Sequence, residues 1–338
     1  MKILIVKFGA LGDVVRTSYF LPGLLKKYPG AEIFWYTSKL SLDLLSSNKY
    51  ITKLFTNEDT YDVLGSESFD YVISLDDERE ILETLYDYSI RVDVGAYIND
   101  DSIVTYTDNS AQWFDMGLLS KFGKIEADRL KKTNKREHNE IFAEILDIDI
   151  SKPYFFGDTT KDIEHFELSS SDYNIGLNPG AGGRWVGKRL LKNEAVRLIN
   201  ELEKKIINKK KVKVFLLGGK TEHDFNNAIL KDCNFLAIDT GADNTLKEFA
   251  KIISMMDLVI TSDSLALHLA IAQGIKSLSF FAPTSSAEIG LFDNGVKVES
   301  LSEDYCSYVS DADNSSITSK RLLDALSSLD KINIEELV

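Results

Sequence analysis

The chain has 338 residues, and its hydrophobic content of 44% and charged content of 27% are typical of a soluble globular protein with room for two domains. Its formal net charge of −14 argues against a general nucleic-acid-binding protein, because phosphate binding requires a basic surface. The two cysteines, Cys233 and Cys306, give neither a disulfide framework nor a metal-binding spacing. The sequence starts directly with a strand-like KILIV and has no apolar run of membrane-spanning length, so we expect a cytoplasmic protein without a signal peptide.

The first half of the chain alternates predicted strands and helices, which favours parallel βα units. The expected strands are short apolar runs at Ile3–Val6, Glu32–Tyr36, Ile51–Phe55, Tyr71–Leu75 and Val92–Tyr97. The expected helices are Asp13–Lys27, Leu40–Leu45 and His138–Leu146. Pro22 lies inside the first helix and should kink or distort it, because proline cannot donate the helical hydrogen bond.

Residues 99–134 show little periodicity and run into a basic stretch from Arg129 to Arg136. We interpret the basic stretch as a solvated loop, with contact to an anionic acceptor or a lipid head group as the alternative. The stretch from Ser151 to Asp172 contains a proline and a serine run and indicates a domain boundary. We therefore expect one Rossmann-like domain over residues 1–165 and a second over 166–338, whose terminal helix has the option of packing back on the first.

The second half restarts the alternation. The expected strands are Asn174–Asn178, Lys211–Leu217, Phe235–Ile238, Leu258–Thr261 and Ser277–Phe281. The expected helices are Leu190–Ile207, Asp224–Leu230, Thr245–Met255, Leu265–Ala272 and Lys320–Leu329. The prediction is an α/β protein with two doubly wound domains. Ligands in such folds bind at the carboxyl ends of strands, so the cleft between the domains is the expected site.

A glycine turn, Gly9-Ala10-Leu11-Gly12-Asp13, follows the first predicted strand. Glycines allow a tight turn and a close backbone approach to a ligand, and Asp13 opens the following helix. A plain helix N-cap is the alternative role of Asp13, because aspartate is favoured there. The turn does not match GxGxxG, so a nicotinamide-binding fingerprint is not supported.

The segment from Asn178 to Arg189 combines four glycines with two arginines and Lys188 between a strand and a helix. Close backbone N–H groups and cationic side chains are what a diphosphate requires. A P-loop is not expected, because Arg189 stands where the magnesium-binding Ser or Thr would be. The alternative is an ordinary loop with solvated cations.

Two further turns follow predicted strands. Glu222, after Gly218-Gly219, has two interpretations: it accepts hydrogen bonds from a ribose or base, or it serves the start of the next helix. Asp263 and Ser264 open an apolar helix, whose N-terminal N–H groups and dipole favour an anion. His268 lies four residues after Ser264 and so on the same helix face, which favours a ligand-facing role over a core role.

Three segments together resemble glycosyltransferase family 9, the heptosyltransferase-like enzymes of bacterial surface glycan synthesis. They are KILIVKFGALGDVVRTSYFLPGLLKKYPGAEI near the N-terminus, NPGAGGRWVGKRL in the middle, and TSDSLALHLAIAQG with FFAPTSSAEI near the C-terminus. The resemblance implies a GT-B fold, two Rossmann-like domains facing a central cleft. It also implies an inverting, metal-independent transferase that uses a nucleotide-diphosphate sugar, commonly ADP-heptose, as co-substrate and needs no cofactor.

The resemblance also implies roles for individual residues. Asp13 would be the general base, with Gly9, Gly12 and Arg16 on the acceptor side. Lys188 would act in catalysis and hold the diphosphate with the loop that contains Gly180, Ala181, Gly182 and Arg184. Glu222 would contact the nucleoside, and the remaining donor-site residues would be Asp263, Ser264, Leu265, Ala266 and His268. No metal ligand is implied.

The resemblance further implies an anionic glycan or glycolipid acceptor, such as the lipopolysaccharide core, and no nucleic-acid partner. Peripheral contact with the inner face of the inner membrane goes with such an acceptor. The chain departs from the family pattern at Asp263-Ser264-Leu265, where the family has Asp-Thr-Gly. Two alternatives stay open: a nucleotide-sugar epimerase of the same architecture, and a non-catalytic subunit that binds a sugar nucleotide.

Overall fold

The structure is a computed structural model that describes residues 1–152, 166, 168–235, 237–329 and 332–336. The chain divides into two compact units. Unit 1 comprises Met1–Phe156 with Ala287–Gly290, and unit 2 comprises Gly157–Ser286 with Leu291–Val338. The predicted boundary between residues 165 and 166 falls in a stretch, 153–167, most of which lies outside the described residues.

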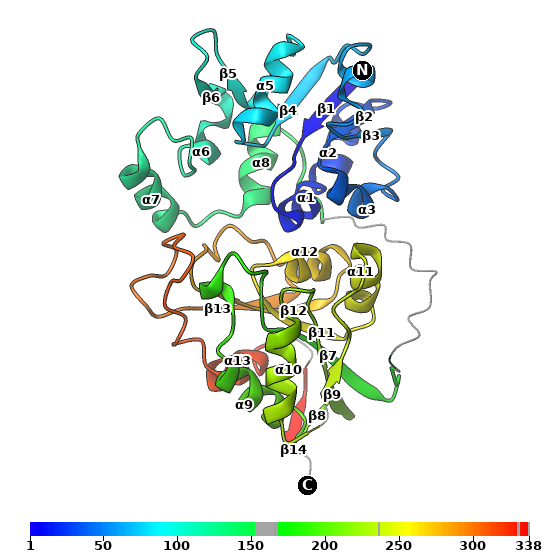
Figure 1. The fold of residues 1–338 in the computed structure, drawn as a ribbon, viewed down its shortest axis with the longest axis vertical. Coiled ribbons are helices and arrows are strands. Elements are labelled where there is room, and N and C mark those ends of the chain that lie inside the picture. Colours follow the sequence, from blue (N-terminus) through cyan, green and yellow to red (C-terminus); the bar gives the residue numbers. More distant parts are fainter. Residues whose placement is uncertain (153–165, 167, 236, 330–331, 337–338) are drawn as a thin grey trace. The chain divides into compact units, whose positions relative to one another are not determined.

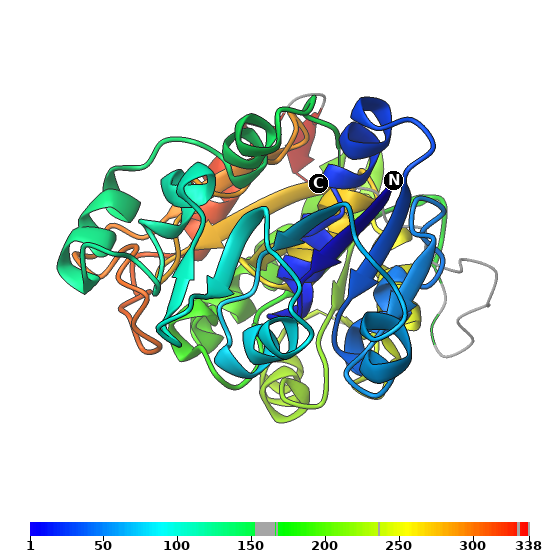
Figure 2. The ribbon, with the colours of Figure 1, turned by 90° about the horizontal axis from the view of Figure 1, so that it is seen from above.

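Unit 1 is built on a six-stranded sheet in the order β3-β2-β1-β4-β5-β6, in which only β6 is antiparallel to its neighbour. Its strands are β1 (Lys2–Val6), β2 (Glu32–Tyr36), β3 (Lys53–Phe55), β4 (Tyr71–Ser74), β5 (Val94–Ile98) and β6 (Val104–Tyr106). They lie side by side, coloured blue to cyan, in Figure 2. Ile3 to Val6 are fully buried because helices cover both faces of the parallel part of the sheet.

The helices of unit 1 connect these strands and complete its core (Figure 1). They are α1 (Leu11–Thr17), α2 (Phe20–Lys27), α3 (Leu42–Leu45), α4 (Thr60–Leu64), α5 (Arg79–Asp87), α6 (Ala111–Phe114), α7 (Lys124–Thr133) and α8 (His138–Leu146). Two 3₁₀ turns, Lys39–Ser41 and Asp108–Ser110, precede α3 and α6. The chain order reverses between β1 and β4, which makes the carboxyl ends of these two strands the switch point of unit 1.

The helix predicted at Asp13–Lys27 is in fact two helices, α1 and α2, separated at Ser18 and Tyr19. Pro22 explains the break, because it has no N–H for the carbonyl of Ser18 and its ring would clash with that carbonyl in a continuous helix. Pro22 lies instead in the first turn of α2, where an N–H would have no helical partner. The prediction of a distortion was correct, and the helix is interrupted about one turn before Pro22.

Unit 2 is built on an eight-stranded sheet in the order β13-β12-β11-β7-β9-β8-β14, with β10 paired to β9. Its strands are β7 (Asp172–Asn178), β8 (Lys205–Ile207), β9 (Lys210–Leu216), β10 (Ile238–Asp239), β11 (Leu258–Ser262), β12 (Lys276–Phe281), β13 (Gly295–Glu299) and β14 (Ile334–Glu336). The sheet is parallel except at β8, which is antiparallel to both β9 and β14. The switch point lies between β7 and β11. After β7 the chain adds strands on one side of β7, and it later adds β11, β12 and β13 on the opposite side.

The helices of unit 2 are α9 (Lys192–Leu202), α10 (His223–Asp232), α11 (Leu246–Ser254), α12 (Leu265–Ala272) and α13 (Ser319–Leu326). A 3₁₀ turn, Val186–Lys188, lies in the loop after β7. Residues Ala266 to Ile271 of α12 are all buried, which agrees with a sequence in which every residue except His268 is apolar. The N-terminus of α12 is therefore held firmly at the switch point.

Two segments have a secondary structure different from the one that the sequence predicted. The helix predicted at Leu190–Ile207 ends at Leu202, and Lys205–Ile207 forms β8 of a hairpin. Asn208 and Lys209 have φ of 51° and 67°, which matches a two-residue hairpin turn. The basic stretch predicted as a loop lies partly in α7, which runs to Thr133.

The fold class is confirmed: two α/β units, each with a mainly parallel, doubly wound sheet. In the part of the chain that the structure describes, no helix is long and apolar enough to cross a membrane.

Candidate functional site

The switch point of unit 2 brings together two of the segments singled out in the sequence. Thr261 in β11 pairs with Asn178 in β7, so the two strands end next to each other. The glycine-rich loop leaves β7 at Pro179, and the turn at Asp263 and Ser264 leaves β11. The structure thus places the loop and the N-terminus of α12 at one edge of the sheet, where ligands of doubly wound folds bind.

Lys188, Asp263 and His268 form a buried charged cluster at this edge. The Lys188 ammonium lies 2.8 Å from Asp263 Oδ2 and 2.9 Å from the Asp263 carbonyl oxygen. On the other side, His268 Nε2 lies 3.4 Å from Asp263 Oδ1. The side chains of Lys188, Asp263 and His268 are only 13%, 17% and 3% exposed. Lys188 has three N–H donors and uses two of them on Asp263, which leaves one for a further acceptor.

The carboxyl group of Asp263 is strongly biased toward the ionised form. Burial by itself would raise its pKa, but the charge of Lys188 and the hydrogen bond from His268 outweigh burial and hold the pKa well below its usual range. The cluster therefore keeps its carboxylate at neutral and mildly acidic pH. His268 contacts Asp263 rather than open solvent, and its Nδ1 is buried without a hydrogen-bond partner among the described residues.

The start of α12 is tied to β7 by side-chain hydrogen bonds. Asn178 Nδ2 donates to Thr261 Oγ1 and Ser264 Oγ, both at 3.2 Å, and the two hydroxyls lie 2.9 Å apart. Ser264 is the N-cap, but its side chain accepts no bond from the helix backbone. Leu265 and Ala266 lie in the first turn, where backbone N–H groups have no intrahelical acceptor. The helix end thus presents N–H groups and the positive end of its dipole.

Glu222 organises the glycine loop. Its Oε1 accepts from the Gly182 N–H at 2.9 Å and its Oε2 from the Gly219 N–H at 3.0 Å, and the side chain is buried. A Cβ on residue 180 would lie 2.6 Å from Glu222 Cγ, so only glycine fits at this position while Glu222 keeps its place. The sequence left open whether Glu222 contacts a nucleoside or serves the start of the next helix. In the structure the carboxylate bridges two glycine turns.

A second cationic residue of the loop, Arg184, is available to a ligand. Arg184 is exposed, and among the described residues it has no hydrogen-bond or ion-pair partner. Ala181 and Gly182 precede it, and Gly182 has φ of 76° with open space around its Cα. The predicted loop residues Gly180, Ala181, Gly182, Arg184 and Lys188 therefore lie on one connection, as expected.

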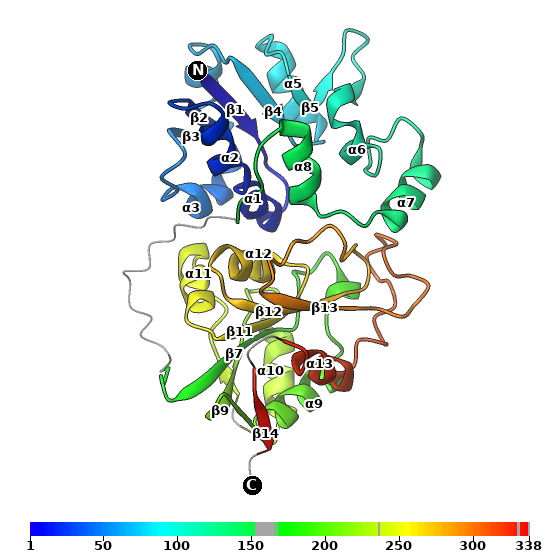
Figure 3. The same ribbon diagram turned by 180° about the vertical axis from the view of Figure 1, so that it is seen from behind.

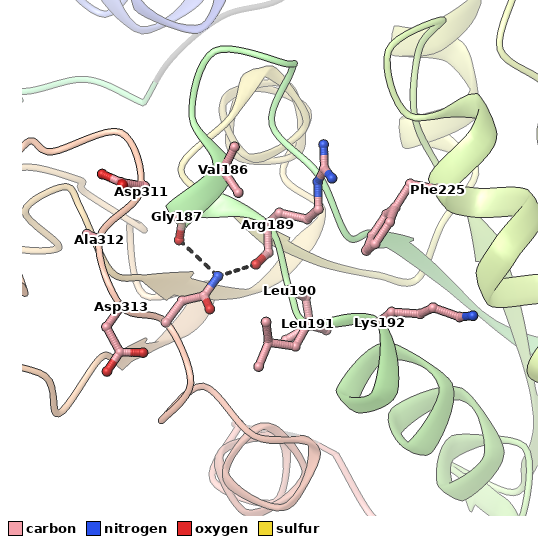
Figure 4. A pocket seen from close by; sticks show the side chains of 11 residues that line it. Val186, Gly187, Arg189, Leu190, Leu191, Lys192, Phe225, Asp311, Ala312 and Asp313 are labelled. Atoms are coloured by element: carbon pink, nitrogen blue, oxygen red, sulfur yellow. Dashed lines mark hydrogen bonds between the residues drawn. The ribbon is translucent and has the colours of Figure 1, made fainter.

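The loop is held from its outer side by the segment before α13 (Figure 4). Asn314 Nδ2 donates to the carbonyl oxygens of Gly187 and Arg189, and the Gly187 N–H donates to the Ser310 carbonyl at 2.8 Å. The same segments line an open pocket that includes Phe225, whose ring lies 4.7 Å from the Arg189 guanidinium carbon. These contacts fix the backbone on both sides of Lys188. Sequence reasoning missed Asn314, because it lies 126 positions from Lys188.

Asp13 lies in the first turn of α1 in unit 1. The N-cap of this helix is Ala10, so the N-cap interpretation of Asp13 was wrong. Asp13 Oδ1 accepts from Arg16 Nη2 at 2.6 Å, and the side chains are 36% and 10% exposed. The guanidinium of Arg16 also lies over the Trp113 ring, 5.9 Å from its centroid. Asp13 is therefore a partly exposed carboxylate whose charge is supported by a buried, positioned cation.

Asp76 holds the glycine turn that leads to Asp13. It follows β4 and is buried, and its Oδ2 accepts from the N–H groups of Phe8 at 2.7 Å and Gly9 at 3.0 Å. The Lys7 ammonium lies 3.7 Å from the same oxygen. Sequence reasoning did not single out Asp76. Its position directly after a buried strand next to β1 was the available signal. Gly12 is buried within α1, and Gly9 has φ of 25°.

Within the described residues, no group of three or more His, Cys, Asp or Glu side chains is arranged to hold a metal ion.

Two Rossmann-like units, the second with a cationic glycine loop and a helix N-terminus at its switch point, define a protein of the GT-B class. A family model described as glycosyltransferase family 9 (heptosyltransferase) matches residues 99–315, more than half of the chain. The chain belongs to this family and is a glycosyltransferase. A search of the curated proteins found no match.

Several solved structures have the same fold. A family 9 glycosyltransferase from Veillonella parvula has a TM-score of 0.75 and 16% identity, with 97% of this chain and 96% of that chain covered. The ADP-heptose lipopolysaccharide heptosyltransferase II of E. coli has a TM-score of 0.67 and 17% identity, with 97% and 98% covered. The E. coli heptosyltransferase WaaC with ADP has a TM-score of 0.62 and 13% identity, with 97% and 99% covered.

The Asp263 cluster predicts a stability change with a defined pH dependence. Asp263→Asn should lower the free energy of unfolding by about 3 kcal/mol or more at pH 7, because it leaves Lys188 buried without its counter-charge. Since the folded-state pKa of Asp263 is depressed, its contribution is fully present above the unfolded-state pKa of about 3.9 and is lost as the pH falls toward the folded-state pKa. Urea unfolding of both proteins between pH 7 and pH 3 measures this difference.

The matched control is Asp243→Asn, because Asp243 forms an ion pair with Lys220 in which both side chains are more than 80% exposed. This variant should change stability little at any pH. Equal effects of the two variants, or a wild-type advantage that grows as the pH falls below 4, would contradict the buried-cluster interpretation.

Glu222 predicts an effect on the nucleotide-free protein. Glu222→Ala should lower its free energy of unfolding by about 2 kcal/mol, because the N–H groups of Gly182 and Gly219 lose their acceptor. A residue that only contacts a donor would leave the stability of the nucleotide-free protein unchanged. Glu201→Ala, which removes a half-exposed ion pair with Lys204, is the control and should have little effect in the same unfolding experiment.

Proposed function

We propose that the enzyme is an inverting, metal-independent transferase that moves a heptose or a related sugar from an ADP-linked donor to a cell-surface glycan such as the lipopolysaccharide core. The observation that carries the proposal is the Lys188 ammonium, which Asp263 holds at the switch point of unit 2 with one N–H donor left. Support for the proposed donor comes from the similar E. coli heptosyltransferase structures, which bear ADP or ADP-2-deoxy-2-fluoro heptose. The proposed location is the cytoplasmic face of the inner membrane.

The proposed donor contacts divide among backbone and side chains of unit 2. The diphosphate takes the remaining Lys188 donor, the Arg184 guanidinium and the first-turn N–H groups of Leu265 and Ala266. Gly180 to Gly182 allow a close approach of the backbone. His268 is buried against Asp263, so its proposed role is to hold that carboxylate and, through it, Lys188. Asp263 and Glu222 already accept bonds from protein donors, and we propose that both shape the donor site by these bonds.

The proposed reaction is a single displacement. The acceptor hydroxyl oxygen bonds to the anomeric carbon while the bond from that carbon to the diphosphate oxygen breaks, and the nucleoside diphosphate leaves with the electron pair. Asp13 takes the acceptor proton, and Arg16 orients its carboxylate through their hydrogen bond. Lys188 and Arg184 neutralise the charge that develops on the leaving diphosphate, so the chain's own cations serve where other transferases use a metal.

Nucleotide binding provides the direct test of the donor. ADP should raise the thermal unfolding midpoint, because a ligand at 100 times its Kd stabilises the folded state by about 2.7 kcal/mol. GDP, UDP and CDP at equal concentration should give smaller shifts, and Lys188→Ala should reduce the shift with ADP. Equal, negligible shifts for all four nucleotides would refute the proposed donor site. A larger shift with another nucleotide would refute the choice of ADP alone.

Substitution of Asp13 tests the general base. Asp13→Asn should lower kcat for transfer to a lipopolysaccharide-core acceptor by about 10²- to 10⁴-fold, measured as ADP release from ADP-heptose. The thermal shift with ADP should stay at the wild-type value, because Asp13 belongs to unit 1. Asp62→Asn is the control, since Asp62 is an exposed carboxylate in the first turn of α4. Near-normal transfer by Asp13→Asn would remove Asp13 from the mechanism.

A further inference from the structure

Three large apolar side chains stand exposed within eight residues of unit 1. Leu118, Phe122 and Ile125 are 91%, 63% and 90% exposed. Large hydrophobic side chains exposed one by one are ordinary on a protein surface, but a local group of them indicates an interaction surface. None of the three is needed to close the core of unit 1, whose buried residues in this region are Phe114, Met116 and Ala127.

Helix α7 has a geometry that explains this exposure. Its only buried residue is Ala127, so little of the helix surface is packed against the rest of unit 1. Gly123 precedes the helix with φ of 78° and has open space around its Cα. The turn at Gly123 places Phe122 before the helix and Ile125 in its first turn, and residues 121–125 are all exposed. Figures 1 and 3 show α7 beyond β6, at the opposite end of the sheet from β3.

The same segment is strongly basic in an acidic protein. Residues 117–136 contain seven Lys and Arg and two acidic residues, whereas the whole chain has a net charge of −14. Both acids are already paired, Glu126 with Arg129 and Asp128 with Lys124. Lys132 and Lys135 are exposed and have no ion-pair partner in the described part of the chain. Lys121 and Arg136 pair with Asp108 and Glu144, which lie outside the segment. The cations that remain open to a partner beside the exposed apolar side chains are therefore Lys132 and Lys135.

This combination selects one kind of partner. Apolar side chains that insert and lysines that lie around them are what an anionic bilayer surface binds. A polyanion in solution would need the cations but not the apolar side chains. An ordinary protein interface would be expected to be poor in lysine.

We propose that residues 117–136 dock unit 1 on an anionic lipid bilayer, with Leu118, Phe122 and Ile125 between the head groups and Lys132 and Lys135 against their phosphates. This docking rests on the location given in the proposed function and names the surface responsible for it, but it does not depend on the donor or on the residues assigned to transfer. It would hold the enzyme at the surface from which a lipid-anchored acceptor is reached.

Vesicle co-sedimentation tests the proposal. The full chain without nucleotide should bind phosphatidylcholine vesicles that contain about 30 mol% phosphatidylglycerol and should not bind pure phosphatidylcholine vesicles. Phe122→Ser with Ile125→Ser should weaken binding at least about tenfold, because two inserted side chains are lost. Lys132→Glu with Lys135→Glu should weaken it at least about 30-fold. Neither pair lies in the core, so the ADP thermal shift should be unchanged and serves as the folding control.

Matched controls lie in unit 2. Lys231→Glu with Lys320→Glu makes the same change of net charge at exposed lysines, and Leu301→Ser removes a side chain that is 76% exposed. Both should bind vesicles as the wild type does. The proposal is overturned if the wild type ignores anionic vesicles or if the controls lose binding equally. It is also overturned if the Phe122 and Ile125 pair binds normally, because the contact would then be electrostatic attraction to any polyanion.

Discussion

The buried carboxylate of Asp263 is the constraint on which unit 2 depends. A charge removed from water is costly unless it is paired and hydrogen-bonded, so burial of Asp263 requires both Lys188 and His268 to be in place. Lys188 comes from the loop after β7, whereas Asp263 and His268 come from the connection after β11. The ion pair therefore joins the two connections that leave the switch point. It also decides where the remaining cationic donor of Lys188 lies.

Both units use a buried acid to shape a glycine turn. In unit 1, Asp76 binds the N–H groups of Phe8 and Gly9, and in unit 2, Glu222 binds those of Gly182 and Gly219. In each case an acid near the end of one strand holds a turn that leaves another strand. Glycine-rich turns lose much conformational entropy on folding, so they keep one shape only where such contacts fix them. The two acids supply this order before any ligand binds.

The sequence predicted the fold well wherever a single pattern decided an element. Leu265–Ala272 was predicted to the residue, because an apolar run bounded by polar turns leaves little choice. The region after Leu202 was wrong, because an amphipathic helix pattern ran on into Ile206 and Ile207, which pair instead with β9. In the candidate site, the residue types of the glycine-rich loop pointed to Lys188. The role of Asp76 was not predicted, because the N–H groups that it binds lie more than 60 positions away and no local sequence pattern records such contacts.

The distribution of charge connects the site with the proposed docking segment. A protein with a net charge of −14 repels both a diphosphate and an anionic membrane at long range, so its cations must act locally. In unit 2 the acids Asp263 and Glu222 are buried and already accept hydrogen bonds, whereas Arg184 is exposed and has no counter-ion among the described residues. In unit 1 the surplus of lysine and arginine is gathered in residues 117–136. Exposed positive charge is thus gathered at the proposed donor site and in the proposed docking segment, and the acidic remainder disfavours adhesion elsewhere.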